Sequence, residues 1–390
     1  MSTTNASRKL LAIPGPIECT DEVMRAIAQP TKSHMDPSFV ATFKEAIHMT
    51  RKVLYTTSAL PFILAGSGTL GWDQVACNLI EQGEAVLVLN TGYFGDGFAD
   101  CLRAYGAIVD VLRAPAAGEI VAASSLEEAI RKRKYKAVVV THVDTSTGVL
   151  SDIKTFSSIV RRVSPDTLVV LDGVCSVASE DIKFDEWDLD IVVSASQKGL
   201  GAPPGLSILV ASQRAIKAFE NRKTPVAAYY CSWQRWIPIM RAYDAGKAAY
   251  FATPAVNMIY ALHASLKQIT ATEDTMRARL LAHRRAGERI RAVARQLGYK
   301  EVPKEGSAAN GMTALYVPTG FAPSDVMPRF ADSGVVIAGG IHKDIKDKYI
   351  RIGHMGTSVV DNERGDIEKI EVALKASVAA KQDLVATEEA

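Results

Sequence analysis

The sequence predicts an α/β fold in which helices cover both faces of a mostly parallel sheet. Two observations support this prediction. Short segments rich in Val, Ile and Leu alternate with longer amphipathic segments up to about residue 211. The short segments lack polar alternation, as expected for strands that are buried on both faces. After about residue 255 helical segments dominate, which indicates a second, smaller α+β domain.

Seven strands are predicted for the main sheet. They are Pro61–Ala65, Ala85–Asn90, Ile108–Leu112, Ala137–Thr141, Thr167–Asp172, Ile191–Ala195 and Leu206–Ala211. Amphipathic stretches such as Ser124–Lys134 and Asp152–Val163 fit helices that pack on this sheet.

The later part of the chain begins with a long helical region from Pro254 to about Leu297. Three further strands follow, at Met312–Val317, Val335–Ala338 and Tyr349–Ile352. At the other end, Pro14-Gly15-Pro16 is too stiff and turn-prone for a regular element and favours an irregular arm. We therefore expect an N-terminal arm (1–18), a large domain (19–272) and a small domain (273–390).

Composition excludes several classes of function. The chain has 45 basic and 43 acidic side chains, so no charge excess favours nucleic acid as a partner. No apolar run approaches the ~20 residues of a membrane span. The histidines lack the spacing of metal ligands, so no metal is expected.

The five cysteines form no C-x-x-C pair and are odd in number, which indicates reduced thiols in an intracellular protein. The N-terminus lacks the apolar core of a secretory signal. We expect a cytoplasmic protein, with a mitochondrial route through the Ser/Thr-rich segment Met1–Leu10, or a peroxisomal location, left open.

A glycine-rich turn follows the first predicted strand. The segment Gly66–Gly71 reads G-S-G-T-L-G, matches G-x-G-x-x-G and opens a predicted helix that runs to Ile80. Backbone N–H groups at such a helix start form an anion site, so a phosphate is expected here. A nicotinamide site would need an acidic residue at the tip of the next strand, which instead ends in Asn90. This missing acid counts against a nicotinamide-dependent oxidoreductase. That class nevertheless stays the main alternative outside the preferred one, ahead of a non-catalytic scaffold.

An aspartate and a lysine follow two consecutive strands. Asp172 ends one strand, and Lys198 comes shortly after the next. If the connection is a parallel crossover, both lie at one edge of the sheet, where open α/β sheets bind ligands. Pyridoxal phosphate needs this set: a lysine for the Schiff base, an acid for the pyridine nitrogen and an anion site for the phosphate. The sequence thus predicts a pyridoxal-phosphate enzyme.

The context of Lys198 resembles a known family. Ser196-Gln197-Lys198, followed by Gly201-Ala202-Pro203-Pro204-Gly205, resembles the class V, fold-type I aminotransferases. Within them the chain is similar to the alanine–glyoxylate (serine–pyruvate) aminotransferases, notably the fungal ones, at Thr141–Thr147 and Ile337–Asp344. The resemblance runs from Pro14 to the helix beyond Met355. It implies pyridoxal 5'-phosphate as cofactor and a homodimer with shared active sites.

The resemblance also implies roles for individual residues. Lys198 and Asp172 would be catalytic. Phe94 would stack on the cofactor ring where the family often has Trp, and Arg351 would bind the substrate carboxylate through its guanidinium fork. Gly15 would line the substrate side. The other implied cofactor contacts are Ser67, Gly68, Thr69, Thr145, Val174, Gln197, and Tyr250 and Thr253, which would reach the cofactor of the neighbouring subunit.

The implied activity is a ping-pong transfer of the amino group of L-alanine to glyoxylate through Lys198. Serine is the alternative donor, as in serine–pyruvate or serine–glyoxylate aminotransferases. A cysteine desulfurase needs a loop cysteine late in the chain, and none follows Cys231.

Overall fold

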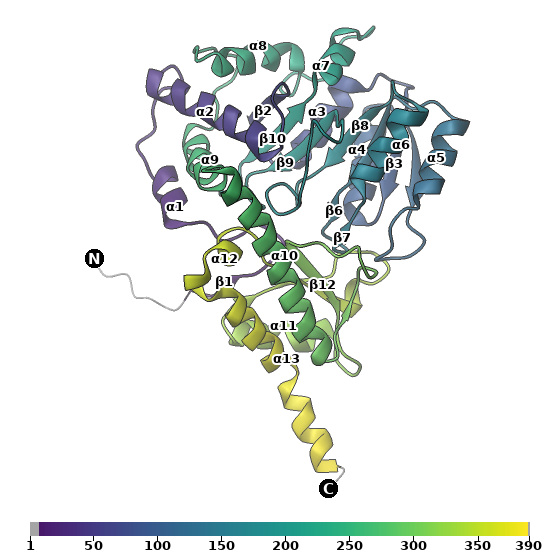
Figure 1. The fold of residues 1–390 in the computed structure, drawn as a ribbon, viewed down its shortest axis with the longest axis vertical. Coiled ribbons are helices and arrows are strands. Elements are labelled where there is room, and N and C mark those ends of the chain that lie inside the picture. The colour runs from purple at the N-terminus through teal and green to yellow at the C-terminus, as the bar shows by residue number, and fades with distance from the viewer. Residues whose placement is uncertain (1–7, 389–390) are drawn as a thin grey trace.

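A seven-stranded sheet forms the centre of the computed structural model, which describes residues 8–388 (Figure 1). Its strands, in order across the sheet, are β2 (Leu60–Ala65), β10 (Leu206–Ala211), β9 (Ile191–Ala195), β8 (Leu168–Asp172), β5 (Ala137–Thr141), β3 (Ala85–Asn90) and β4 (Ile108–Arg113). β10 runs antiparallel to both of its neighbours, and all the other strands run one way. The predicted α/β fold with a mostly parallel sheet is therefore confirmed.

Burial explains why the apolar segments form strands. Val138, Val139 and Val140 of the central strand β5 are completely buried, and β8, β9 and β10 are buried along their whole length. β4 lies at one edge of the sheet and is only half-buried. Covering both faces with helices removes this apolar surface from water, which is the main favourable term in folding.

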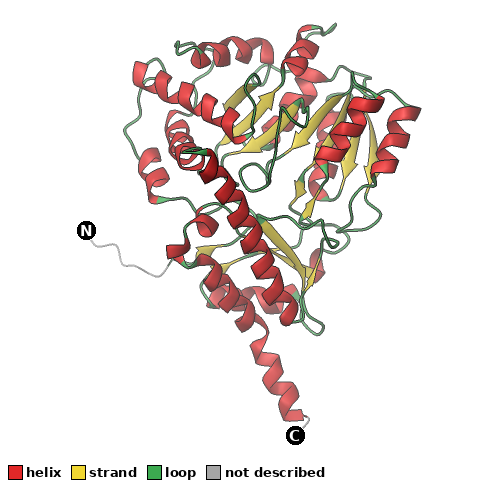
Figure 2. Cartoon of the chain, in the orientation of Figure 1, coloured by secondary structure: helices red, strands yellow, loops and turns green. Residues whose placement is uncertain are grey.

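Helices lie in front of and behind these strands (Figure 2). They are α1 (Asp21–Ile27), α2 (Pro37–Val53), α3 (Thr69–Leu79), α4 (Tyr93–Ala104), α5 (Ala123–Lys132), α6 (Ile153–Val163), α7 (Gln213–Glu220), α8 (Trp233–Asp244) and α9 (Val256–Ile269). Side-chain caps fix several starts. Asp152, for example, accepts a hydrogen bond from the backbone of Thr155 at the start of α6.

One edge of the sheet gathers the segments that the sequence singled out. β2, β8 and β9 run the same way, so their carboxyl ends meet at this edge. The register pairs Thr141 with Asp172, and Asp172 with Val193. The glycine-rich turn after β2, Asp172 and the Lys198 turn after β9 thus lie at the same edge, where open α/β sheets place their ligands.

A second, four-stranded antiparallel sheet forms in the C-terminal part of the chain. Its strands are β11 (Lys300–Glu301), β12 (Met312–Tyr316), β15 (Tyr349–Gly353) and β14 (Ala338–Gly339). Its helices are α10 (Glu273–Gln296), α11 (Pro323–Asp332), α12 (Thr357–Val360) and α13 (Asp366–Glu388). α10 runs from the main sheet to this smaller one (Figure 1). These elements enclose an apolar cluster of their own, while the domain boundary at residues 272 and 273 stays a prediction.

The structure corrects three details. The helical region predicted from Pro254 to Leu297 is two helices, α9 and α10, separated by a short turn. The arm is not wholly irregular, because Leu10–Leu11 (β1) pairs with Val335–Val336 (β13). The single strand predicted at Val335–Ala338 is split, since β13 pairs with the arm and β14 pairs with β15.

Besides β1, two short strand elements were not predicted, β11 and a small hairpin. Val143–Asp144 (β6) and Val149–Leu150 (β7) form a small hairpin just after β5. Across residues 8–388, none of the helices is both long and apolar enough to cross a membrane.

Candidate active site

A pocket of about 190 Å³ opens at the carboxyl ends of β2, β8 and β9. Nine residues that the sequence singled out line it: Ser67, Gly68, Thr69, Phe94, Thr145, Asp172, Val174, Gln197 and Lys198. Trp72, Thr141, Val143 and Cys175 complete its wall. Segments far apart in the chain thus meet in one cavity because the parallel strands end together.

Lys198 lies in the turn after β9 and is largely shielded from water. Its Nζ donates a hydrogen bond of 2.5 Å to the carbonyl oxygen of Pro14 in the N-terminal arm. Burial lowers the pKa of the Lys198 amine, and the positive charge of Arg351 adds to that effect. A lowered pKa gives a larger fraction of neutral amine, the form that acts as a nucleophile or base.

Asp172 ends β8 and is buried beneath the pocket floor. Oδ1 accepts a hydrogen bond from the backbone N–H of Val174 at 3.1 Å, and Oδ2 accepts one from the indole Nε1 of Trp72 at 3.0 Å. Burial nevertheless raises the pKa of Asp172 to about 6, since two donors only partly replace water. A cationic ring nitrogen placed here would favour the charged carboxylate.

The glycine-rich turn leads directly into α3. Gly68 precedes the helix, and a Cβ on it would lie 2.9 Å from Cγ2 of Val174. Leu70 and Gly71 donate to the carbonyls of Ser67 and Gly68, whereas no backbone carbonyl of the described chain accepts from the amides of Gly68 and Thr69. Free amides at a helix start, next to the Ser67 and Thr69 hydroxyls, form a site for a phosphate group.

Phe94 owes its position to a buried carboxylate. Oδ2 of Asp144 accepts from the backbone amides of Phe94 and Gly95 at 3.1 and 3.3 Å, which holds the start of α4. Ser146 donates its amide and its hydroxyl to Oδ1 of the same carboxylate. The ring of Phe94 meets that of Trp72 edge-on, at 6.5 Å between centroids. Phe94 thus presents an aromatic wall to the pocket.

Two polar atoms on the pocket wall are buried without a hydrogen-bond partner among the described residues. They are Oε1 of Gln197 and Oγ1 of Thr141. Leaving such groups unpaired costs free energy, so a polar ligand that bonds to them is favoured. Together with a buried amine, a buried carboxylate, an aromatic wall and a free helix start, these atoms fit pyridoxal phosphate.

Arg351 and Gly15 lie beside the pocket rather than in its wall. Arg351 projects from β15, and its Nε and Nη1 donate to the carbonyls of Gly339 and Thr145 at 2.8 and 3.3 Å. Gly15 packs directly on Lys198, because a Cβ at Gly15 would lie 2.5 Å from Nζ. Arg351 therefore approaches the cavity from the C-terminal sheet, and Gly15 approaches it from the arm.

Tyr250 and Thr253 are the two implied contacts that the structure does not bring to this pocket. Tyr250 is 60% exposed, and its ring lies 4.9 Å from that of His34. Thr253 is exposed as well. Their expected role toward a neighbouring subunit stays a prediction.

The sequence did not identify four residues of the pocket wall, Trp72, Thr141, Val143 and Cys175, or Asp144, which is not part of the wall. Trp72 is a direct donor to Asp172, Asp144 holds Phe94, and Cys175 lines the wall. Asp144, a buried carboxylate three residues after β5 ends at Thr141, gives a signal similar to the one that identified Asp172 at the end of β8. The direction of the Trp72 indole carries no such signal, since it depends on how α3 packs against β9 and β10.

Comparisons with known proteins agree with this geometry. The model of the family "Aminotransferase class-V" matches residues 18–353. Alanine–glyoxylate aminotransferase 1 of Saccharomyces cerevisiae is 45% identical over 359 residues, covering 89% of this chain and 92% of that protein. Serine–glyoxylate aminotransferase of Arabidopsis thaliana is 28% identical, covering 94% and 90%.

Solved structures point the same way. The crystal structure of an alanine–glyoxylate aminotransferase from Nostoc sp. superimposes with a TM-score of 0.88 at 26% identity and covers 97% of each chain. This fold, the pocket at the strand ends and the family match over most of the sequence exclude the nicotinamide alternative and imply pyridoxal phosphate as cofactor. The chain belongs to the class V aminotransferases of fold-type I and is an aminotransferase.

Proposed function

We propose that the enzyme transfers the amino group of L-alanine to glyoxylate, giving pyruvate and glycine. The observation that carries this proposal is the position of Arg351, which meets the carbonyl of Thr145 in the pocket wall while Lys198 lies in the same pocket. Alanine and glyoxylate share one carboxylate and little else, so a single arginine suits both. The 45% identical yeast relative carries the name of this activity.

Pyridoxal phosphate, when bound, supplies an electron sink that makes the α-proton of an amino acid acidic. Residues of the chain would bind the substrate, keep the ring nitrogen protonated and transfer the proton. Arg351 would hold the substrate carboxylate through its guanidinium fork. Asp172 would keep a proton on the ring nitrogen. The Lys198 amine, with its lowered pKa, would carry a proton between the substrate and the cofactor.

The arm would exclude water from this exchange. Pro14 is buried, and its carbonyl accepts from Nζ of Lys198, so the arm covers the amine on one side. Gly15 leaves no side chain in that contact, which keeps the space beside Nζ free for a small substrate. A pocket of about 190 Å³ would favour small amino acids over bulky ones once the cofactor is in place.

Serine is the second candidate donor. It differs from alanine by one hydroxyl, and the Arabidopsis relative is named for serine and glyoxylate. A pocket of this kind does not strongly reject an added hydroxyl. The two donors therefore have to be compared by kcat/KM in one assay.

A screen of amino donors against keto acceptors tests the proposal. We expect alanine with glyoxylate to give the highest kcat/KM, with initial-rate plots in parallel lines as for a ping-pong reaction. A higher kcat/KM for serine would shift the function to the second candidate. Turnover with neither donor would contradict both.

We further propose a homodimer with active sites shared between subunits, with Tyr250 and Thr253 completing the phosphate site of the partner. Their exposure, outside the pocket of their own chain, supports this expectation. Analytical ultracentrifugation tests the dimer. A Tyr250→Phe variant that dimerises normally but binds the cofactor more weakly would support the shared site.

A further inference from the structure

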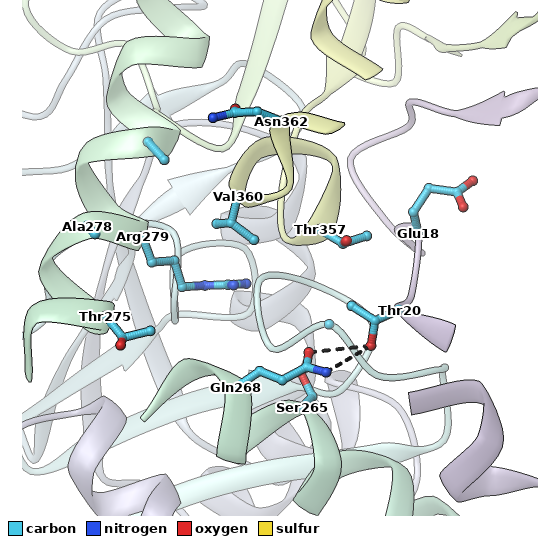
Figure 3. A pocket seen from close by; sticks show the side chains of 12 residues that line it. Glu18, Thr20, Ser265, Gln268, Thr275, Ala278, Arg279, Thr357, Val360 and Asn362 are labelled. Carbon is cyan, nitrogen blue, oxygen red and sulfur yellow. Dashed lines mark hydrogen bonds between the residues drawn. The ribbon is translucent and has the colours of Figure 1, made fainter. Parts of the chain in front are cut away.

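A second cavity, of about 470 Å³, lies where the N-terminal segment, α9, α10 and α12 meet (Figure 3). No residue lines both this cavity and the Lys198 pocket. Gly201, three residues after Lys198, forms part of its wall. Its polar side chains are mostly neutral: Thr20, Ser265, Gln268, Thr275, Thr357 and Asn362.

Arg279 of α10 extends its guanidinium into this cavity (Figure 3). Nε donates to the carbonyl of Ala178 at 2.9 Å, and Nη2 donates to the carbonyl of Gly199 at 2.6 Å. A guanidinium has five N–H donors, so these two bonds leave three free, on Nη1 and Nη2. Among the described residues, no carboxylate forms an ion pair with Arg279 and none accepts from Nη1.

The single acidic residue of the cavity wall is already neutralised elsewhere. Glu18 accepts hydrogen bonds from Arg8, from the backbone of Leu11 and from Arg364, at 2.7, 3.1 and 3.4 Å. In Figure 3 its carboxylate points away from Arg279. The charge that faces the cavity is therefore the unpaired guanidinium. Burial lowers the pKa of Arg279 to about 10, so it stays protonated at neutral pH and lacks a counter-ion.

We propose that this cavity binds a small organic carboxylate, held end-on by Nη1 and Nη2 of Arg279. Two parallel N–H donors match the two oxygens of a carboxylate. The hydroxyls and amides that line the cavity, including those of Ser265, Thr275 and Asn362, suit a hydroxylated or second polar group on the same ligand. A single cation favours a singly charged head group over a phosphate.

Arg279 connects this cavity to the turn that carries Lys198 through hydrogen bonds. The same guanidinium holds Gly199, which follows Lys198, and Ala178, whose φ of 64° lies in the left-handed region. Gly199 is packed so closely that a Cβ would lie 2.3 Å from the carbonyl oxygen of Val177. A ligand that fixes Arg279 thus stabilises the turn carrying Lys198, as well as the contact between α9, α10 and α12.

Calorimetric titration of the cofactor-loaded enzyme with malonate tests this site. An Arg351→Gln background removes the substrate carboxylate site that we proposed above, so the remaining heat reports the second cavity. Ala278→Glu places a resident carboxylate beside Arg279 and is expected to weaken malonate binding at least about tenfold. Ala116→Glu, the same change in an exposed turn outside the cavity, is the matched control and leaves the affinity unchanged.

Arg279→Lys keeps the charge and loses the fork, so it is also expected to weaken binding, with thermal melting used to verify that it folds. Inorganic phosphate, titrated in parallel, is expected to bind more weakly than malonate. The assignment is overturned if malonate does not bind in the Arg351→Gln background, if Ala278→Glu binds it as well as Ala116→Glu does, or if phosphate binds at least as tightly.

Discussion

The indole Nε1 of Trp72 donates a 3.0 Å hydrogen bond to Oδ2 of Asp172, at the base of the pocket that holds Lys198. This bond lowers the pKa of a carboxylate that burial raises, so it favours the charged form. Trp72 also stacks on Phe98 at 5.2 Å between centroids, which fixes the indole plane. Trp72 therefore holds Asp172 in place and favours its charged form.

Trp72→Phe removes the donor and keeps an aromatic ring. Because the pKa of Asp172 then rises further, we expect the acidic limb of the pH–kcat profile to move to higher pH and kcat at neutral pH to fall about tenfold. Trp187→Phe is the control, since the Nε1 of Trp187 has no hydrogen-bond partner among residues 8–388. An acidic limb that stays in place would show that the bond does not tune Asp172.

Asp172→Asn separates activity from stability. Without its carboxylate the enzyme should lose at least about a hundredfold in kcat. In the cofactor-free protein the pKa of Asp172 is raised from 3.8 to about 6, which corresponds to about 3 kcal/mol. A raised folded-state pKa gives stability that is present below pH 3.8 and is lost as the pH rises through about 6.

Urea unfolding of cofactor-free protein between pH 4 and pH 7 checks the second half of this prediction. The free energy of unfolding of the natural protein should fall over this range relative to that of Asp172→Asn. If the free energies of unfolding of the two proteins changed with pH in the same way, burial would not raise the pKa of Asp172.

Gly15→Ala tests the contact between the arm and the lysine. The new Cβ would lie 2.4 Å from Cδ and 2.5 Å from Nζ of Lys198, so either the arm or the amine must move. We expect kcat/KM to fall about a hundredfold, the loss typical of a 1 Å misplacement. Gly306→Ala also places a side chain at a positive φ, of +82°, but its Cβ meets no atom within 4 Å. Equal losses in both variants would assign the effect to strain alone.

Arg351→Lys tests the substrate carboxylate site. Lysine keeps a positive charge but lacks the planar fork, so KM for alanine and for glyoxylate should both rise about tenfold or more. Arg291→Lys, another buried arginine on the C-terminal side of the chain, should leave both KM values nearly unchanged. A rise for one substrate only would contradict a carboxylate site that the two share.

The main sheet was predictable from the sequence because its strands are long, apolar and buried on both faces. Each of the seven strands lies within one residue of its predicted bounds. β1, β6, β7 and β11 escaped because two-residue strands carry no periodic signal and exist only through their partners, as Leu10 does through Val335. The turn between α9 and α10 was missed because the sequences on both sides of it favour helix.

The site residues that lie at or just after the ends of strands were predictable from the sequence. Asp172, Lys198 and the glycine-rich turn meet because the strands before them are parallel. Trp72 and Asp144 act through side-chain directions that only packing sets. The role expected of Tyr250 would depend on a second chain, and the hydrogen bonds of Arg279 depend on where α10 packs against the turn after Lys198.

Borohydride reduction followed by peptide mass spectrometry tests the central claim, that Lys198 binds the cofactor covalently. The reduced enzyme should carry the pyridoxyl group on the peptide that contains Lys198. A Lys198→Ala variant, treated in the same way, should carry none. A pyridoxyl group on another lysine of the natural protein, or an undiminished yield in Lys198→Ala, would contradict the account.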